Sequence, residues 1–271
     1  GAQRWIQLGP ITLQPSEFSK IIMIVALAAM LEDRVGKLNT ISDILPVVGY
    51  VALPFLLVLK QPDLGTSLVF IAILLGMIFV AGVNLRILAL SFAAGIAVSP
   101  LLWHFLKDYQ KMRLKVFLDP SVDPLGSGYH IIQSKIAIGS GLIFGKGLFG
   151  GTQSQLNFLP ENHTDFIFAV VGEELGFVGA AALLLLYLVV LWRGVKIARD
   201  ANDAFGRLLA VGITSMLAFH VLVNVGMTTG IMPVTGIPLP LMSYGVSSLT
   251  TNLIAITILL NIHMRKAKFV F

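Results

Sequence analysis

The sequence predicts an all-α polytopic membrane protein, a helical bundle with about seven transmembrane helices. Of its 271 residues, 56% are hydrophobic and 12% are charged, whereas ordinary soluble domains carry about 25% charged residues. Apolar runs long enough to cross ~30 Å of hydrocarbon as a helix recur along the whole chain. These observations exclude a soluble core and favour a single transmembrane domain over residues 1–271.

Each expected span is an apolar run whose ends carry polar, Gly or Pro residues. The first begins at Pro15, because Pro is favoured in the first turn of a helix. The seven spans cover roughly residues 15–32, 44–60, 64–82, 86–106, 165–192, 206–229 and 247–264. Residues 107–164 then form a large extracytoplasmic loop, and so long a stretch without a span indicates a function.

The distribution of Lys and Arg orients these spans. One set of loops holds ten basic residues, and these loops are 32–43, 83–86, 193–207 and 264–271. The other side holds nine, of which six lie in the 107–164 loop, which nears the length at which charge stops deciding orientation. The first set, with the tail Arg265-Lys266-Lys268, is therefore expected in the cytoplasm. Arg4, the 107–164 loop and residues 230–246 are expected outside.

Composition also narrows the partners of the chain. It has no Cys, which excludes disulfides and thiolate metal sites. The net charge of +5 suits a protein among anionic lipids, and no basic face with interleaved aromatic residues indicates nucleic acid. Residues 1–5 contain neither an initiator Met nor a signal sequence, so we expect the natural protein to extend upstream.

Asp165 stands at the outer mouth of the fifth span. A carboxylate at that depth is costly unless it faces water or a partner. The residues alone leave two interpretations open. Thr164 or Asp165 could cap the free amides of the helix that starts at Phe166, or Asp165 could be a functional acid at the rim of an outward cavity.

Glu173 and Glu174 follow in the same span. At 100° and 1.5 Å per residue, Glu173 lies about 80° around the helix from Asp165 and ~12 Å along it, whereas Glu174 points nearly opposite to Asp165. At most one glutamate shares the face of the aspartate. Both are expected to be buried acids paired with another helix.

Arg4, Trp5 and Lys20 form a second group on the outer side. Lys20 lies about one and a half turns into the first span. It could snorkel to the membrane interface, or it could face a cavity that binds an anion. Asp63, in the stretch QPDLGTS, is expected to cap the start of the third span.

Several glycine and histidine motifs have simple interpretations. GKGLFG, from Gly145, matches G-x-G-x-x-G, but no strand precedes it, so turns in an outer loop are expected and a backbone phosphate nest is the alternative. The glycines of GEELGFVG favour close helix packing. His130 and His163 lack the spacing of a strong metal site.

The stretch TGIPLPLMSYG, residues 235–245, places two prolines in an apolar segment between spans. Two prolines so close together disfavour a continuous helix. Irregular backbone is tolerated at membrane depth only where it lines protein or a water-filled cavity. The stretch therefore indicates a re-entrant or broken segment beside such a cavity.

The chain resembles the SEDS family (shape, elongation, division and sporulation), and within it the RodA type. The resemblance covers essentially the whole chain and rests on the ordered stretches RWIQLGPITLQPSEFSK, QPDLGTS, DPLGSGYHIIQSKIAIGSG, GTQSQLNFLPENHTDFIFAVVGEELG and GIPLPLMSYG. Members of the family have about ten transmembrane helices, so the chain looks like a member that lacks the first three.

The resemblance implies a peptidoglycan glycosyltransferase that polymerises lipid II on the outer face of the bacterial cytoplasmic (inner) membrane during rod elongation. Asp165, in the HTDF motif, matches the essential acid of the family, and Arg4, Trp5 and Lys20 match positions associated with its cavity. Transfer from an α-linked donor to a β-1,4 product inverts the anomeric carbon. Such a transfer needs one base and no covalent nucleophile, which suits Asp165 as general base.

The resemblance also implies partners. These are lipid II, glycan linked to undecaprenyl pyrophosphate, a class B penicillin-binding protein (a transpeptidase) and other membrane proteins of the elongation complex. Arg4 and Lys20, with Lys135 or Arg113, could supply positive charge to the departing pyrophosphate. A divalent cation, Mg or Mn, could share that role, although the sequence shows no dedicated cage. Trp5 could stack on a sugar or anchor at the interface.

Two other functions remain open. A lipid II transporter (flippase) would use the acids Glu173 and Glu174 and the broken IPLPL segment. No inverted repeat relates the two halves of the chain, which weakens this interpretation. The other alternative is a non-catalytic scaffold for the class B penicillin-binding protein.

Overall fold

The computed structural model describes residues 4–8, 11–105, 107–124, 126–156 and 158–265. The chain separates into two compact units. Unit 1 comprises Gly1–Ala94, Val189–Phe219 and Gly245–Phe271, and unit 2 comprises Gly95–Leu188 and His220–Tyr244. Lys266 and Lys268 of the basic tail lie outside the described residues.

Each of the seven predicted spans coincides with a helix. These helices are α1 (Pro15–Glu32), α2 (Ile41–Lys60), α3 (Leu64–Val80), α4 (Leu85–Phe105), α8 (Ile167–Asp200), α9 (Ala204–Thr229) and α10 (Val246–Arg265). By length and composition, α2, α8, α9 and α10 can cross a membrane, and α3 and most of α4 are shorter apolar helices. The predicted class, an all-α polytopic membrane protein, is confirmed.

Unit 1 begins with an antiparallel hairpin that the sequence did not predict, β1 (Ile6–Leu8) and β2 (Ile11–Leu13). The chain then enters α1 with Pro15 at its start, as predicted. The backbone N–H of Gln14 donates to Oγ of Ser247 at 2.9 Å. This bond ties the exit of the hairpin to the start of α10.

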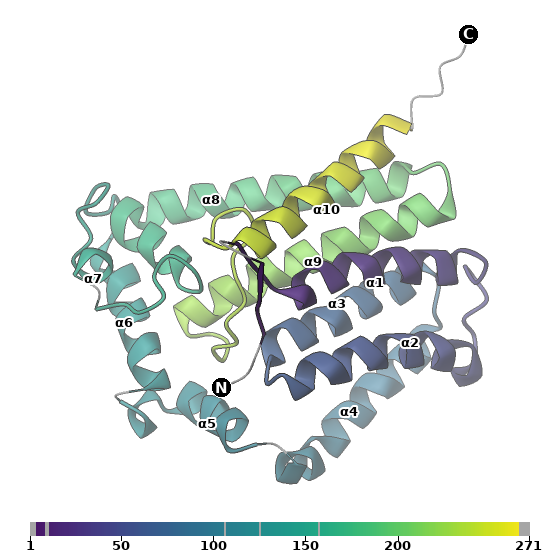
Figure 1. Ribbon diagram of the computed structural model, residues 1–271, viewed down its shortest axis with the longest axis horizontal. Coiled ribbons are helices and arrows are strands. Elements are labelled where there is room, and N and C mark those ends of the chain that lie inside the picture. Colours follow the sequence, from purple (N-terminus) through teal and green to yellow (C-terminus); the bar gives the residue numbers. More distant parts are fainter. Residues whose placement is uncertain (1–3, 9–10, 106, 125, 157, 266–271) are drawn as a thin grey trace. The chain divides into compact units, whose positions relative to one another are not determined.

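The core of unit 1 forms where α3 packs against α1 and α2 (Figure 1). Ile24 and Leu27 of α1 and Met77 of α3 are fully buried. The first part of α9 joins them at Gly212, where an added methyl group would lie 2.7 Å from Ile24 Cγ2 and 2.8 Å from Met77 Sδ. A glycine there lets three apolar helices approach closely, which is how helices associate where no water drives them together.

Unit 2 contains the whole of the large loop predicted over residues 107–164. The described residues of the loop form the short helices α5 (Asp108–Leu118), η1 (Pro120–Val122), α6 (Ser127–Ser140) and α7 (Thr152–Gln155). Two apolar clusters lie beside the start of α8. One contains Ala137, Leu159, Phe166 and Ala169, and the other contains Phe168, Tyr187, Val221 and Leu239. The residues that lead into α8 are therefore held by packed neighbours.

Helix α8 is interrupted at Gly176, whose φ of 64° and ψ of −164° are not helical. The prediction that the glycines here serve close packing is right for Gly172, since a methyl group there would lie 3.1 Å from Ile138 Cγ1. At Gly176 close packing is only part of the explanation, because that residue lies against the backbone of Gly145 and also breaks the helix. Only Gly adopts such a conformation at low cost.

The break leaves backbone groups of α8 without helical hydrogen-bond partners, and the segment before α7 supplies these partners. The carbonyl oxygens of Glu173 and Glu174 accept from the N–H groups of Lys146 and Gly147, both at 3.0 Å, and Phe177 N–H donates to the carbonyl of Leu142 at 2.8 Å. The GKGLFG stretch therefore satisfies the backbone of α8. The backbone N–H groups of Lys146 and Gly147 already donate to these carbonyls, which contradicts the alternative of a phosphate nest at these two residues.

Glu173 is fully buried, as predicted, but its partners come from the loop and not from a neighbouring span. Its carboxylate accepts from Lys146 Nζ at 2.9 Å and from the N–H groups of Gln153 and Ser154 at 2.9 and 3.0 Å. It thus caps the start of α7 and neutralises one lysine. The same prediction is wrong for Glu174, which is only half-buried and accepts from Gln155 Nε2 at 3.4 Å.

Replacing Gly176 by Ala is expected to destabilise the fold. The left-handed backbone costs an L-residue about 1–3 kcal/mol, and the new methyl group would lie 2.3 Å from the backbone nitrogen of Gly145. The melting temperature of the purified protein in detergent measures the effect. Gly147→Ala is the matched control, because its φ is +88° but no atom lies within 4 Å of the added methyl. Equal losses in the two variants would contradict the close contact at Gly176.

His130 predicts a pH dependence of stability. Its ring stacks on Phe166 at 5.9 Å between centroids, and burial lowers the pKa of His130 below its ordinary 6.5 despite the opposing effect of Glu161 and Asp123. The unfolded chain therefore takes up the proton first as the pH falls below about 6.5, so this stabilising contribution is present above that value and is lost below it.

The corresponding variant is His130→Phe, which keeps a stacked ring and cannot titrate. Between about pH 7.5 and about pH 5.5 its melting temperature should fall less than that of the wild type. Identical pH profiles for the two proteins would show that His130 contributes nothing to the acid sensitivity.

Candidate active site

The segment between α9 and α10, residues 230–245, is not helical. The prediction of a broken segment at this place is confirmed. Side chains hold its backbone, since Asn224 Nδ2 donates to the carbonyl of Ile237 at 2.7 Å and Tyr187 Oη donates to the carbonyl of Pro240 at 2.6 Å. The N–H of Leu239 donates to Ser243 Oγ at 2.7 Å. The segment is thus fixed despite having no regular structure.

The same groups join this segment to the turn that precedes α8. Asn224 Nδ2 also donates to the carbonyl of Asp165 at 2.9 Å, and Ser243 Oγ donates to the carbonyl of Thr164 at 2.6 Å. The N–H of Tyr244 donates to the carbonyl of His163 at 2.9 Å. Three consecutive residues of the HTDF motif therefore have their backbone bound to residues 224–244.

The carboxylate of Asp165 lies against the backbone of this segment. Asp165 is half-buried, and a methyl group added to Gly236 would lie 3.1 Å from its Oδ2. Gly236 has a φ of +75°, so Gly is favoured here both by the backbone and by the space that the carboxylate needs. The hydroxyl of Thr164, the other predicted cap, donates to Glu161 Oε2 at 3.0 Å.

Arg113 and Lys135 contact the same segment. Arg113 Nη1 donates to the carbonyl of Thr235 at 3.5 Å, and its guanidinium lies 6.0 Å from the ring centroid of Tyr109. Lys135 is exposed and extends over Gly230, where an added methyl group would lie 2.6 Å from Nζ. The structure therefore brings three of the predicted site residues, one acid and two cations, onto one segment of unit 2.

Two residues that position this site were not predicted. Asn224 is fully buried within α9, and among the described residues its Oδ1 has no hydrogen-bond partner. A polar amide in an apolar span is costly unless it binds something, so its presence was a usable signal. Gly236 gave no such signal, because its role depends on a residue that is far away in the sequence.

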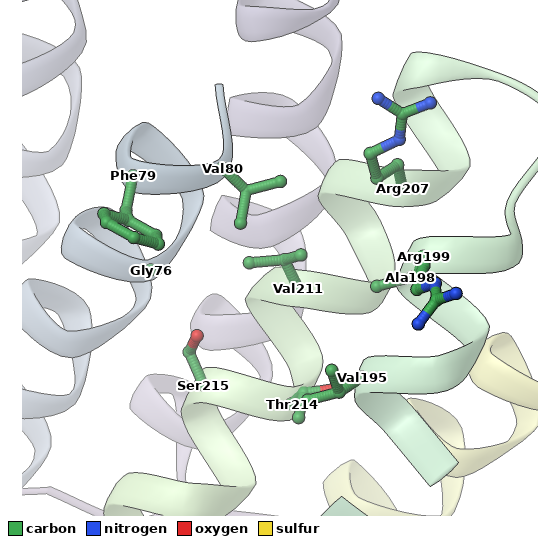
Figure 2. Close-up of a pocket in the computed structure, with 10 residues that line it drawn as sticks. All are labelled: Gly76, Phe79, Val80, Val195, Ala198, Arg199, Arg207, Val211, Thr214 and Ser215. Atoms are coloured by element: carbon green, nitrogen blue, oxygen red, sulfur yellow. The ribbon is translucent and has the colours of Figure 1, made fainter. Parts of the chain in front are cut away.

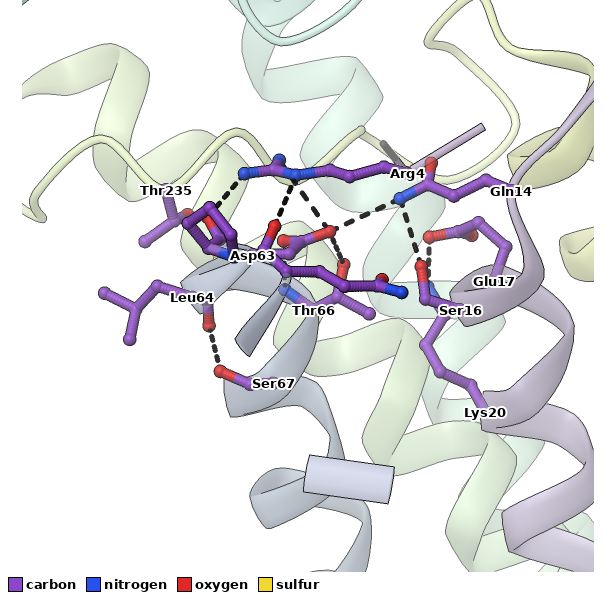
Figure 3. A network of polar contacts seen from close by, with 12 residues as sticks. Arg4, Gln14, Ser16, Glu17, Lys20, Asp63, Leu64, Thr66, Ser67 and Thr235 are labelled. Carbon is purple, nitrogen blue, oxygen red and sulfur yellow. Dashed lines mark hydrogen bonds and ion pairs between the residues drawn. The ribbon is translucent and has the colours of Figure 1, made fainter. Parts of the chain in front are cut away.

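The predicted cations of unit 1 lie in a different network (Figure 3). Arg4 Nε donates to the carbonyl of Gln61 at 2.9 Å, Nη2 donates to that of Pro62, and Nη1 lies 3.9 Å from Asp63 Oδ2. Asp63 caps α3 by accepting from Thr66 N–H at 3.1 Å, which confirms its predicted role. Its carboxylate thus serves both the helix start and Arg4.

Lys20 does not snorkel toward the membrane interface. Its side chain is 1% exposed, and Nζ donates to Glu17 Oε1 at 2.7 Å (Figure 3). Removing one member of such a buried pair typically costs 3–5 kcal/mol, because an uncompensated charge is left behind. Lys20 therefore contributes to the first turns of α1. Trp5 is 52% exposed, which is compatible with both of its predicted roles.

The arrangement in unit 2 can perform acid–base chemistry next to an anion. A half-buried carboxylate on a rigid backbone can accept a proton, and an exposed Lys and a half-buried Arg can meet negative charge. Within the described part of the chain, no group of three or more His, Asp or Glu residues could hold a metal ion.

Comparisons with known proteins identify relatives. Residues 1–268 match the family model FtsW/RodA/SpoVE, described as cell cycle protein. The chain is 47% identical over 267 residues to the peptidoglycan glycosyltransferase MrdB of Escherichia coli (strain K12), covering 98% of this chain and 72% of that protein. It is 45% identical over 269 residues to the stage V sporulation protein E of Bacillus subtilis (strain 168), covering 97% and 71%.

Solved structures are similar as well. A chain from a structure titled as the coordination of polymerization and crosslinking by a peptidoglycan synthase complex superposes with a TM-score of 0.81 at 36% identity, covering 99% of this chain and 75% of that chain. The rod shape determining protein RodA of Thermus thermophilus superposes with a TM-score of 0.68 at 32% identity, covering 99% and 71%. The chain therefore belongs to the FtsW/RodA/SpoVE family.

Proposed function

We propose that this protein is a peptidoglycan glycosyltransferase that polymerises lipid II into glycan strands, with Asp165 as general base. The observation that carries the proposal is the convergence of Asp165, Arg113 and Lys135 on the rigid segment 230–245. Relatives that cover most of this chain carry the same activity in their names.

The proposed reaction inverts the anomeric carbon of the donor. The 4-hydroxyl oxygen of the acceptor sugar attacks that carbon, and the bond from carbon to the pyrophosphate oxygen breaks with its electron pair leaving on the lipid pyrophosphate. The hydroxyl proton passes to the carboxylate of Asp165. One base suffices because no covalent intermediate forms. The hydrogen bond from Asn224 to the Asp165 carbonyl supports this role, since it fixes the backbone that carries the base.

The departing pyrophosphate requires positive charge. Lys135 suits this role best because it is exposed, and Arg113 contacts the same segment through the carbonyl of Thr235. Arg4 and Lys20 each have a carboxylate close by, Asp63 and Glu17 respectively. Their charge is already compensated in part, so in this proposal they bind substrate more weakly and organise the ends of α1 and α3.

The proposed location is the bacterial cytoplasmic membrane, with Asp165 on its outer side. The excess of basic residues in the short loops supports this orientation. The proposed protein partner is a class B penicillin-binding protein, which would crosslink the strands. A similar solved chain comes from a complex whose title joins polymerization with crosslinking, and this supports the assignment.

A transporter of lipid II is a weaker alternative. Discontinuous helices in transporters leave carbonyl groups free to coordinate ions. In α8, by contrast, the carbonyls freed at Gly176 accept from Lys146 and Gly147 N–H groups, and Glu173 is engaged by the loop. The buried acid and the broken backbone that favoured a transporter in the sequence are therefore explained by contacts within the protein.

The substitution Asp165→Asn is expected to abolish polymerisation. It removes the base while preserving the size of the side chain, so the rate should fall about a hundredfold or more. The assay follows glycan strands made from lipid II by the purified protein together with its class B penicillin-binding protein. Glu174→Gln is the matched control, because it neutralises another half-buried acid of the same region and should retain the rate. Normal synthesis by Asp165→Asn would refute the assignment.

The substitution Gly236→Ala is expected to lower kcat at least tenfold with little change in KM, because a displaced base costs much more than its small movement suggests. The new methyl group would lie 3.1 Å from Asp165 Oδ2. Gly36→Ala is the control, since Gly36 has a φ of +74° with no atom within 4 Å of the added methyl. Equal kcat in both variants would show that Gly236 does not position the carboxylate.

A further inference from the structure

A cavity lies in unit 1, and none of the predicted site residues line it (Figure 2). It encloses about 360 Å³ between α3, the last part of α8 and the first part of α9. Its lining residues are Gly76, Phe79, Val80, Val195, Ala198, Arg199, Arg207, Val211, Thr214 and Ser215. This volume is within the range of roughly 300–1,000 Å³ that small-molecule pockets have.

Close helix contacts define the inner end of this cavity. A methyl group added to Gly76 of α3 would lie 2.1 Å from Ser215 Oγ of α9, and one added to Gly194 of α8 would lie 2.3 Å from Thr214 Oγ1. The three helices therefore touch at these points and leave a space beyond them. Val80, Val195 and Val211 give that space apolar walls. It suits an alkyl chain better than a polar solute.

The rim of the cavity carries positive charge. Arg199 of α8 and Arg207 of α9 are among its lining residues, on the side opposite Phe79 and Val80 of α3 (Figure 2). Both arginines are exposed, and neither guanidinium has a hydrogen-bond or ion-pair partner among the residues that the structure describes. The nearby carboxylate of Asp203 is engaged, since it accepts from Gly206 N–H at 3.0 Å.

The segment that contains both arginines, residues 193–207, is also positively charged. Between residues 193 and 207 the chain holds four basic and two acidic residues. Two of the basic residues, Arg193 and Lys196, lie over the ring of Trp192 at 5.4 and 5.6 Å and do not line the cavity. The cavity therefore combines an apolar interior with a specific pair of arginines at the ends of membrane helices.

We propose that this cavity binds one anionic phospholipid of the surrounding bilayer. The phosphate binds the arginines of the rim, Arg199 and Arg207, and part of one acyl chain occupies the apolar space along Val211. Basic pockets between membrane helices recognise anionic headgroups by charge, and the apolar interior adds affinity for the chain, which a free anion lacks. The site is separate from the proposed polymerisation, so either assignment can fail alone.

The test uses the purified protein in detergent, titrated with phosphatidylglycerol or phosphatidylcholine, and counts retained lipids by native mass spectrometry. One phosphatidylglycerol per chain is expected, with a higher melting temperature, and little phosphatidylcholine. The double variant Arg199→Gln/Arg207→Gln should lose about tenfold or more of this affinity. The charge-matched double variant Arg193→Gln/Lys196→Gln should stay within about twofold of the wild type.

A third variant separates the cavity from its charged rim. Val211→Phe fills the apolar space while both arginines remain, and it should also release phosphatidylglycerol. Retention by Val211→Phe, equal losses in the two charge variants, or equal binding of both lipids would each overturn the proposal. Stabilisation by inorganic phosphate alone would do so too, since it indicates a simple anion site.

Discussion

The side-chain amide of Asn224 makes the interaction on which the candidate site depends. It donates to the carbonyl oxygens of both Asp165 and Ile237 from a fully buried position in α9. At membrane depth, backbone groups outside regular helices need a partner from protein or from a water-filled cavity. One amide therefore solves this problem for two segments at once, and in doing so it fixes Asp165 next to residues 230–245.

The same constraint explains the architecture around the break in α8. Gly176 ends one helical segment, and the carbonyls that it exposes accept from Lys146 and Gly147 N–H groups. Glu173, just before the break, is neutralised by Lys146 and caps α7. The loop between α6 and α8 is thereby bound to α8 through backbone and charge together. The interrupted helix provides the carbonyl groups that bind the loop, and the loop provides the N–H groups that satisfy the interrupted helix.

Charges in the two units have different surroundings, and this separates structural from functional roles. In unit 1, Lys20 and Glu17 form a buried pair, and Arg4 lies beside Asp63. Buried pairs of this kind mainly avoid the cost of an isolated charge. Lys135 of unit 2 is exposed, and the exposed guanidinium groups of Arg199 and Arg207 at the unit 1 cavity have no hydrogen-bond or ion-pair partner among the described residues. Such accessible cations are the ones available to an external anion.

The sequence by itself determined the fold class and the seven helices. It also singled out Asp165 as an acid in an unusual position. Long apolar runs have few alternatives in a membrane, because only helices satisfy their own backbone along such a run. The sequence also indicated the broken segment, since Pro238 and Pro240 lie so close together that a continuous helix is disfavoured. Asp63 was recognisable as a cap for a similarly local reason.

Only the tertiary structure decided which groups meet. The pairing of Glu173 with Lys146 and the approach of Asp165 to Gly236 join residues that are distant in the sequence, and no local pattern encodes such a distance. The break at Gly176 also escaped prediction, because a glycine in an apolar run serves equally well for packing or for interruption. What distinguishes the two is whether another segment supplies the missing hydrogen bonds, and that depends on the fold.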